Sequence, residues 1–214
     1  MVHVILPVGL LQCNCSIFGD EQSREAIVID PGDEIERITE VLDRYQLKVK
    51  AIVITHAHID HVAGAHKLRA LTGAPVYMNE SDRELLNALD VQAGWLGMAT
   101  PQRTEVDSAA NDGTVLRLGN ADFQVMHTPG HTQGSLSIWS PSEEKLVAGD
   151  TLFRDSIGRT DLPGGDEEAI YESIARRLYS LPGEQAVYPG HGLATTIGEE
   201  RRLNPFVQAE GAAR

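Results

Sequence analysis

The feature that most constrains this chain is a dense group of potential metal ligands at the end of an apolar segment. Residues 51–54 read Ala-Ile-Val-Ile, an apolar run that predicts a buried strand. Residues 55–61 follow directly and read Thr-His-Ala-His-Ile-Asp-His. Holding so many polar groups at a strand end brings no packing gain, so their spacing indicates a metal site. The candidate ligands in this segment are His56, His58, Asp60 and His61.

The spacing within this group predicts two neighbouring ion positions. Side chains alternate along an extended backbone, so His56 and His58 project to one side and can hold a single ion. A tighter turn at Ile59 would direct Asp60 and His61 toward a second position close by. Imidazole nitrogens and carboxylate oxygens suit zinc, iron or manganese better than calcium.

Three later segments place another ligand-type residue just beyond a predicted strand, beside glycine or proline. They read Thr-Pro-Gly-His at 128–131, Val-Ala-Gly-Asp at 147–150 and Val-Tyr-Pro-Gly-His at 187–191. Functional residues concentrate in loops held by a rigid scaffold, and glycine lets the backbone bend sharply near an ion. We therefore expect His131 to complete the first ion position, His191 to complete the second, and Asp150 to bridge the two.

These motifs, taken together, resemble the metallo-β-lactamase superfamily, and their order resembles its hydroxyacylglutathione hydrolase (glyoxalase II) branch. The resemblance runs from about residue 2 to about residue 207. It implies an α/β fold, an αβ/βα four-layer sandwich in which two mixed β-sheets face each other with helices outside, in a single domain over residues 1–214. The closer resemblance is to the short bacterial form, which lacks a C-terminal helical domain. The segments that carry it are Gly149–Phe153, Ser156–Asp161, Pro189–Gly192 and Glu199–Pro205.

The resemblance implies a metal-dependent thioester hydrolase that cleaves S-D-lactoylglutathione, or a related hydroxyacyl-glutathione, to the free acid and the thiol. The implied cofactors are two divalent metal ions, Zn²⁺ first, with Fe²⁺ or Mn²⁺ as alternatives. A hydroxide held between the metals would attack the thioester carbonyl. Asp60 and Asp150 are the expected catalytic carboxylates, and the expected partner is a small-molecule thioester.

An anionic glutathione thioester requires local positive charge in a chain whose formal net charge is −13. Arg154 and Arg159 are the candidate substrate-binding side chains, because arginine pairs bidentately with carboxylates. Arg159 stands where longer members of the resembled branch place a lysine, and Asp161 stands where they place a tyrosine that helps hold the thiol peptide.

Two other activities that occur on this fold remain open. Persulfide dioxygenases share the Gly-Arg-Thr-Asp run at 158–161 and bind one iron through two histidines and an aspartate, here matching His56, His131 and Asp150. They usually carry Pro-Ala-His-Asp where this chain has Pro-Gly-His-Gly at 189–192. A lactonase keeps the full ligand set, whereas the aspartate at 150 argues against a lactamase.

Composition and charge exclude other classes of protein. The acidic net charge opposes nucleic-acid binding, and no apolar run is long enough to span a membrane. Residues 1–7 predict a first strand and not a signal peptide. Cys13 and Cys15 lie two apart in a predicted strand, where a disulfide is poorly placed and small buried side chains are expected. We therefore expect a cytoplasmic protein, and the oligomeric state stays open.

Hydrophobic patterns predict one continuous arrangement of strands and helices. The residue before Pro31, Asp30, is a candidate partner for a ligand histidine or a simple turn residue. The stretch 91–113 has no clean periodicity and fits either a lid over the site or a surface crossover. Strands are expected near 2–8, 12–19, 26–30, 50–54, 75–78, 114–118, 121–127, 135–139, 145–149 and 185–188, and helices near 33–46, 63–72, 80–90, 166–179 and 197–203.

Overall fold

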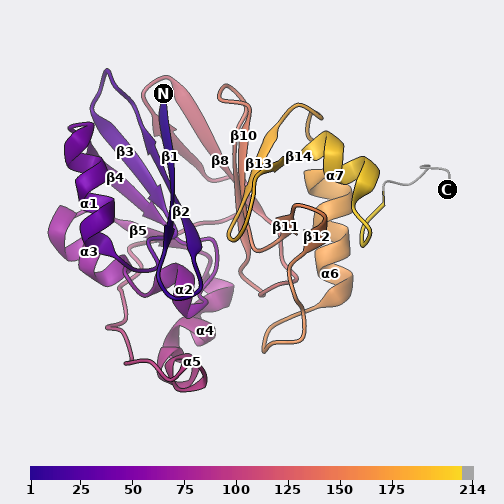
Figure 1. The fold of residues 1–214 in the computed structure, drawn as a ribbon, viewed down its shortest axis with the longest axis horizontal. Helices are drawn as coiled ribbons and strands as arrows, with labels where there is room; N and C mark the ends of the chain where they lie inside the picture. Colours follow the sequence, from indigo (N-terminus) through magenta and orange to yellow (C-terminus); the bar gives the residue numbers. More distant parts are fainter. Residues whose placement is uncertain (209–214) are drawn as a thin grey trace.

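Two six-stranded β-sheets face each other in the computed structural model, which describes residues 1–208 (Figure 1). Helices α1 (Ile35–Arg44) and α3 (Ala65–Thr72) cover the outer face of one sheet, and α6 (Glu167–Glu172) and α7 (Ile197–Leu203) lie outside the other (Figure 1). The predicted four-layer sandwich is therefore confirmed. Residues 209–214 of the predicted domain lie outside the described part of the chain.

The first sheet follows the order of the sequence, from β1 at one edge to β6 at the other. Its first two pairings are antiparallel and the later ones are parallel, so the sheet is mixed. The strands are β1 (Val2–Val8), β2 (Cys13–Gly19), β3 (Glu25–Ile29), β4 (Lys48–Val53), β5 (Val76–Met78) and β6 (Ser108–Ala109).

The second sheet has the order β14-β13-β10-β9-β8-β7 and is also mixed. Because β9 is antiparallel to both β8 and β10, and β10 is parallel to β13, the strands β8, β10 and β13 all run the same way. The strands are β7 (Val115–Leu118), β8 (Ala121–His127), β9 (Leu136–Ser140), β10 (Lys145–Gly149), β13 (Ala186–Pro189) and β14 (Thr195–Thr196). A separate hairpin pairs β11 (Leu152–Phe153) with β12 (Ser156–Ile157).

Strand alternation divides the core into layers. Between the sheets, Ile27 and Ile29 of β3 pack in one cluster with Phe123 and Val125 of β8. Val28, between the two isoleucines, points the other way and packs with the buried residues of α1. A third cluster fills the space behind the second sheet, where Leu146, Ala148 and Val187 pack with Ile170, Ile174 and Leu178.

Most predicted elements appear within a few residues of their expected ends, and the differences lie in the short ones. The predicted helix 80–90 is a 3₁₀ turn, η1 (Glu80–Asp82), followed by α4 (Arg83–Asn87) and α5 (Leu89–Leu96). Helix α5 extends into the stretch 91–113, which the sequence left open. The predicted helix 166–179 is α6 plus a π-helical segment, η2 (Ser173–Leu178), and a one-turn helix, α2 (Ile59–Val62), precedes α3. Within residues 1–208, no helix is both long and apolar enough to cross a membrane.

Candidate metal centre

All the ligand-bearing loops meet at one end of the facing sheets. His56 and His58 lie in the loop after β4, and α2 begins one residue later, so Asp60 and His61 fall in its first turn. The other three loops follow the carboxyl ends of β8, β10 and β13, which run in the same direction. They carry the remaining ligand candidates, His131, Asp150 and His191.

The structure brings the seven predicted metal ligands together in two sets. Ligand atoms lie within 4.8 Å of one another in the set His56, His58 and His131, and likewise in the set Asp60, His61 and His191. The closest atoms are His131 Nε2 and His58 Nδ1 at 2.9 Å in the first set, and His191 Nε2 and Asp60 Oδ2 at 3.1 Å in the second.

Asp150 lies between the two sets. Its Oδ2 is 3.6 Å from His131 Nε2 in the first set, and its Oδ1 is 3.5 Å from His61 Nε2 in the second. The same Oδ2 also lies 3.8 Å from His191 Nε2. One carboxylate therefore faces both ion positions, as the bridging hypothesis requires.

The other ring nitrogen of four of the ligand histidines is held by a hydrogen bond from outside the cluster. His61 Nδ1 donates to Asp30 Oδ2 at 2.9 Å, and His131 Nδ1 donates to the carbonyl of Arg159 at 2.8 Å. His191 Nδ1 donates to the carbonyl of Leu11 at 3.0 Å. His56 Nδ1 lies 3.1 Å from Thr55 Oγ1. These contacts set the tautomer and leave the inner nitrogen as a lone-pair donor, which is the arrangement that metal-binding histidines require.

The donor set fits a pair of divalent cations. Among the described residues, the buried atoms His56 Nε2 and Asp150 Oδ1 have no hydrogen-bond partner, so an ion can satisfy both. Burial and neighbouring imidazoles lower the pKa of His56 well below its usual range, and burial lowers the pKa of His58 to about 3. Neutral imidazoles are the form that binds metal.

Gly190, beside His191, leaves room for this cluster. A Cβ at this position would lie 2.1 Å from Asp150 Oδ1 and 2.7 Å from His61 Cε1. Any other residue would therefore overlap the ligand side chains, so the glycine is required by close approach.

Asp30 resolves one alternative that the sequence left open. It is buried, and it has a positive φ of 55° at the end of β3. Besides His61, its carboxylate accepts hydrogen bonds from the backbone N–H and the hydroxyl of Thr55, both at 2.7 Å. The residue therefore supports the ligand loop as well as ending the strand. Cys13 lies beside Asp30 and His61, where it is buried and outside any disulfide. Burial raises the pKa of its thiol to about 12.

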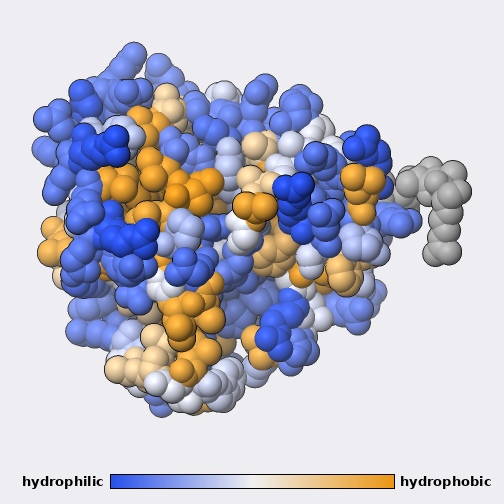
Figure 2. All heavy atoms as spheres, in the orientation of Figure 1, coloured by the Kyte–Doolittle hydropathy of each residue, from blue (hydrophilic) through white to orange (hydrophobic). Residues whose placement is uncertain are grey.

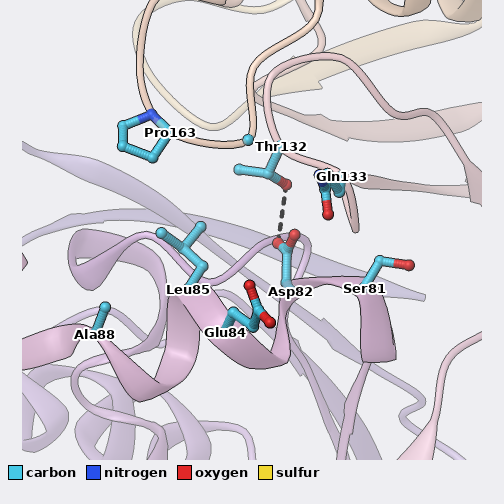
Figure 3. A pocket seen from close by; sticks show the side chains of 9 residues that line it. Ser81, Asp82, Glu84, Leu85, Ala88, Thr132, Gln133 and Pro163 are labelled. Atoms are coloured by element: carbon cyan, nitrogen blue, oxygen red, sulfur yellow. Dashed lines mark hydrogen bonds between the residues drawn. The ribbon is translucent and has the colours of Figure 1, made fainter.

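Two further residues hold the ligand loops and were not found by sequence reasoning. The carboxylate of Asp82 accepts hydrogen bonds from Ala57 N (2.9 Å), Thr132 Oγ1 (2.8 Å) and Gly134 N (2.6 Å), and Figure 3 shows the Thr132 contact. Gln92 accepts from Ile59 N at 2.9 Å. The sequence does contain a signal for Gln92, because it falls on the same face of α5 as the buried residues Leu89 and Ala93. A buried side-chain amide needs hydrogen-bond partners, which indicates a structural role.

A cleft of about 490 Å³ opens onto the cluster. Arg159 lines it, but its guanidinium is paired with the Asp161 carboxylate through two hydrogen bonds of 2.7 Å. This pairing lowers the pKa of Asp161 to about 2. Arg154 does not line the cleft; its side chain is 55% exposed and lies 3.8 Å from Asp155. The lining residues are Leu11, His58, Ile59, Asp60, Gln92, Trp95, Leu96, His131, Asp150, Arg159, Leu162 and His191.

Comparison with known families agrees with this geometry. The profile of the metallo-beta-lactamase superfamily matches residues 8–191. The chain belongs to this superfamily. Its members are generally hydrolytic enzymes that bind divalent metals, and the seven-residue cluster is where this chain can bind them.

Among curated relatives, hydroxyacylglutathione hydrolase GloC of Haemophilus influenzae is 36% identical over 208 residues, which cover 96% of this chain and 98% of that protein. Among solved structures, the B3 metallo-beta-lactamase BLEG-1 matches with a TM-score of 0.89 and 36% identity, over 96% of this chain and 99% of that one. TTHA1623 in a di-iron-bound form matches with a TM-score of 0.86 and 39% identity, over 95% and 100%. ETHE1 from Myxococcus xanthus matches with a TM-score of 0.81 and 30% identity, over 96% and 84%.

Proposed function

We propose that this chain is a dinuclear metal-dependent thioester hydrolase, and that its substrate is S-D-lactoylglutathione or a related hydroxyacyl-glutathione. The observation that carries the proposal is the meeting of two three-residue ligand sets on either side of the Asp150 carboxylate. The identity to GloC across nearly the whole of both chains supports the substrate class.

Each residue of the cluster has a defined part in this proposal. His56, His58 and His131 would hold one cation, Asp60, His61 and His191 the other, and Asp150 both. When bound, two Zn²⁺ ions, or Fe²⁺ or Mn²⁺, supply Lewis acidity that lowers the pKa of a water molecule toward ~7 and polarises the substrate carbonyl.

The chain's own side chains prepare the reaction. Burial opposes ionisation of Asp60, but the neighbouring His61 and the hydrogen bond with His191 lower its pKa below the usual range. Asp60 is therefore ionised at neutral pH, and because it lines the cleft it can orient the attacking water by accepting a hydrogen bond from it. The leaving thiol ionises easily, with an unperturbed pKa of about 8.5, so no dedicated acid is needed at that end.

Metal content and turnover of the same preparation test the proposal. Protein purified without added metal should contain about two metal ions per chain and should cleave S-D-lactoylglutathione, followed as the loss of thioester absorbance. Asp150→Ala should abolish turnover and lower the metal content at both positions. Asp122→Ala is the matched control, because Asp122 is an exposed carboxylate on β8. Full metal occupancy in Asp150→Ala would show that the bridging assignment is wrong.

A second candidate, persulfide dioxygenase activity, is favoured by one specific observation, the 30% identity to ETHE1 at a TM-score of 0.81. His56, His131 and Asp150 would supply the two histidines and one carboxylate of a single iron site. Oxygen uptake with glutathione persulfide, measured beside thioester cleavage, separates the two activities. A single iron per chain and oxygen uptake without thioester turnover would replace the hydrolase proposal. A chromogenic β-lactam and a lactone belong in the same substrate panel, since BLEG-1 is a lactamase relative and a lactonase keeps the same ligands.

A further inference from the structure

One wall of the metal cleft is apolar and faces solvent. Trp95 and Leu96 of α5 and Leu11 of the β1–β2 turn line the cleft, and the side chains of Trp95 and Leu11 are 60% and 44% exposed. Leu10 and Met98 extend the same surface, because a small neighbouring hollow is lined by Leu10, Leu11, Leu96 and Met98 together. Figure 2 shows hydrophobic surface gathered over the β1–β2 turn and α5. Exposed aromatic and leucine side chains grouped beside a site indicate a binding surface.

This wall is tied to the metal ligands through hydrogen bonds. Gln92, on the buried face of α5, accepts from Ile59 N at 2.9 Å and donates to the carbonyl of Ala57 at 3.2 Å, so α5 is fixed to the ligand loop after β4. The carbonyl of Leu11 accepts from His191 Nδ1 at 3.0 Å, so the β1–β2 turn is fixed to a ligand itself. The apolar side chains therefore stand at a set position relative to the reacting centre.

The charged groups of the cleft give little for an anionic substrate to bind beyond the metal centre. Within residues 1–208, Arg159 is the one lysine or arginine that lines the cleft, and its guanidinium is already paired with Asp161 through two hydrogen bonds. The remaining ionisable lining residues all belong to the cluster: the carboxylates Asp60 and Asp150, and the histidines His58, His131 and His191. A glutathione peptide carries two carboxylates, and each would lose hydration without gaining a cationic partner.

We propose that the preferred substrates are thioesters with an apolar arm, branched, aromatic or longer aliphatic, which packs on Trp95, Leu96 and Leu11 while the thioester carbonyl lies at the cluster. The inference rests on the thioester hydrolase proposed above and goes beyond its hydroxyacyl-glutathione substrate class: lactoylglutathione is still cleaved, and apolar thioesters are preferred over it. The apolar arm belongs to the acyl group or to the thiol, and two substrate series tell these sources apart.

The first measurement is kcat/KM of the metal-loaded protein across the two series. One series keeps N-acetylcysteamine as the thiol and lengthens the acyl group from acetyl to hexanoyl, with lactoyl and benzoyl included. The other keeps the lactoyl group and changes the thiol from glutathione to N-acetylcysteamine and to benzyl mercaptan. Full burial of one methylene is worth about fourfold, so on this half-open wall kcat/KM should rise about twofold per methylene of the acyl group if the acyl group carries the apolar arm. If the thiol carries it, kcat/KM should rise from glutathione to benzyl mercaptan. A flat or falling response in both series would overturn the inference.

Substitutions of Trp95 and Leu11 test whether these side chains cause the preference for apolar thioesters. Trp95→Ala should lower the ratio of kcat/KM for the best apolar substrate to that for the acetyl thioester by about tenfold, and Trp95→Phe should restore most of it. Leu11→Ala should lower the same ratio, and Leu71→Ala is its matched control, since Leu71 on α3 is 62% exposed and does not line the cleft. Equal loss on all substrates in Trp95→Ala would assign Trp95 a structural role and overturn the inference.

Binding without turnover keeps this inference separate from the proposed function. Thioethers that match the best apolar thioesters cannot be hydrolysed, and their binding to the metal-loaded protein can be followed calorimetrically and by Trp95 fluorescence, with Trp95→Phe as the spectroscopic control. Tight binding of apolar thioethers with no thioester cleavage would support the apolar cleft and refute the hydrolase. Thioester cleavage with equal binding of apolar and polar thioethers would support the hydrolase and refute the apolar cleft.

Discussion

The carboxylate of Asp82 connects the ligand loops of the two sheets, and its replacement by asparagine tests how the site is held. Asp82 is 2% exposed and lies at the end of η1. Its Oδ2 accepts from Ala57 N, between His56 and His58, and from Thr132 Oγ1, next to His131. All three ligands of the first ion position are therefore neighbours of residues that Asp82 contacts (Figure 3 shows Asp82 facing Thr132).

The expected loss of unfolding free energy in Asp82→Asn follows from the three hydrogen-bond donors that contact the carboxylate. Oδ1 accepts from Gly134 N and Oδ2 accepts from Ala57 N and Thr132 Oγ1, so both oxygens are used as acceptors. Asparagine offers one acceptor oxygen, and its amide NH₂ would face at least one buried N–H. Losing a hydrogen bond to a charged acceptor costs about 1.5–3 kcal/mol, and a buried donor without a partner adds about 1–3 kcal/mol. Burial raises the pKa of Asp82, so part of the gain is offset by desolvation of the carboxylate. We expect a net loss of about 3 kcal/mol.

Urea unfolding of the metal-loaded protein measures this loss directly, and metal titration measures its effect on the site. Asp82→Asn should lower the free energy of unfolding by about 3 kcal/mol and weaken the first ion position, while Asp122→Asn, an exposed carboxylate paired with Arg117, should change it by less than about 0.5 kcal/mol. Thr132→Val should give an intermediate loss, because it removes one of the three donors. A loss below about 1 kcal/mol with unchanged metal affinity would refute the reasoning.

Three other outcomes are expected. Arg69 holds the pKa of Asp107 to about 2, so the stability that this pair contributes is present above pH ~4 and is lost as the pH falls through 2. Acid unfolding of Asp107→Asn should lack that step, which solvent exposure limits to about 1 kcal/mol. Removing bound metal with a chelator should lower Tm by roughly 10 °C in calorimetry, since ligands that bind the native state at a thousand times Kd contribute about 4 kcal/mol; an unchanged Tm would contradict metal binding at the cluster. Gly190→Ala should cut metal content and activity together, because its Cβ would overlap Asp150 and His61; full metal content in this variant would contradict it.

The ligand set and the fold were accessible from the sequence for the same physical reason. Each ligand stands just past a short apolar run, and such runs become buried strands whose ends meet at one edge of a sheet. Periodicity therefore placed Val53, Gly149 and Pro189 close to strand ends, and the structure has β4, β10 and β13 ending at those residues. Helix α1 (Ile35–Arg44) lies within the predicted range 33–46, and α7 (Ile197–Leu203) coincides with the predicted range 197–203.

What the sequence did not reveal depends on contacts between distant segments. The short strands β6, β11, β12 and β14 have too few residues for a periodic signal. Arg154 and Arg159 were both candidates from their positions after Asp150. The path of the β11–β12 hairpin shows that Arg159 alone of the two reaches the cleft and that Asp161 neutralises it. In the sequence, Asp82 is indistinguishable from an acidic residue in the first turn of the predicted helix 80–90. Its three hydrogen-bond donors come from loops 25 to 52 positions away, which local patterns do not reveal.

The division of ligands between the two sheets says why this fold suits a metal centre. The first ion position takes two histidines from the loop after β4 and one from the loop after β8, and the second takes Asp60 and His61 from α2 and His191 from the loop after β13. Neither half of the chain holds a complete set. Asp82 and the Leu11 carbonyl then add hydrogen bonds that cross between the halves at the same end. Because each ion position takes ligands from loops of both sheets, metal binding stabilises the packing of the two sheets against each other. That packing in turn sets the spacing of the ligands.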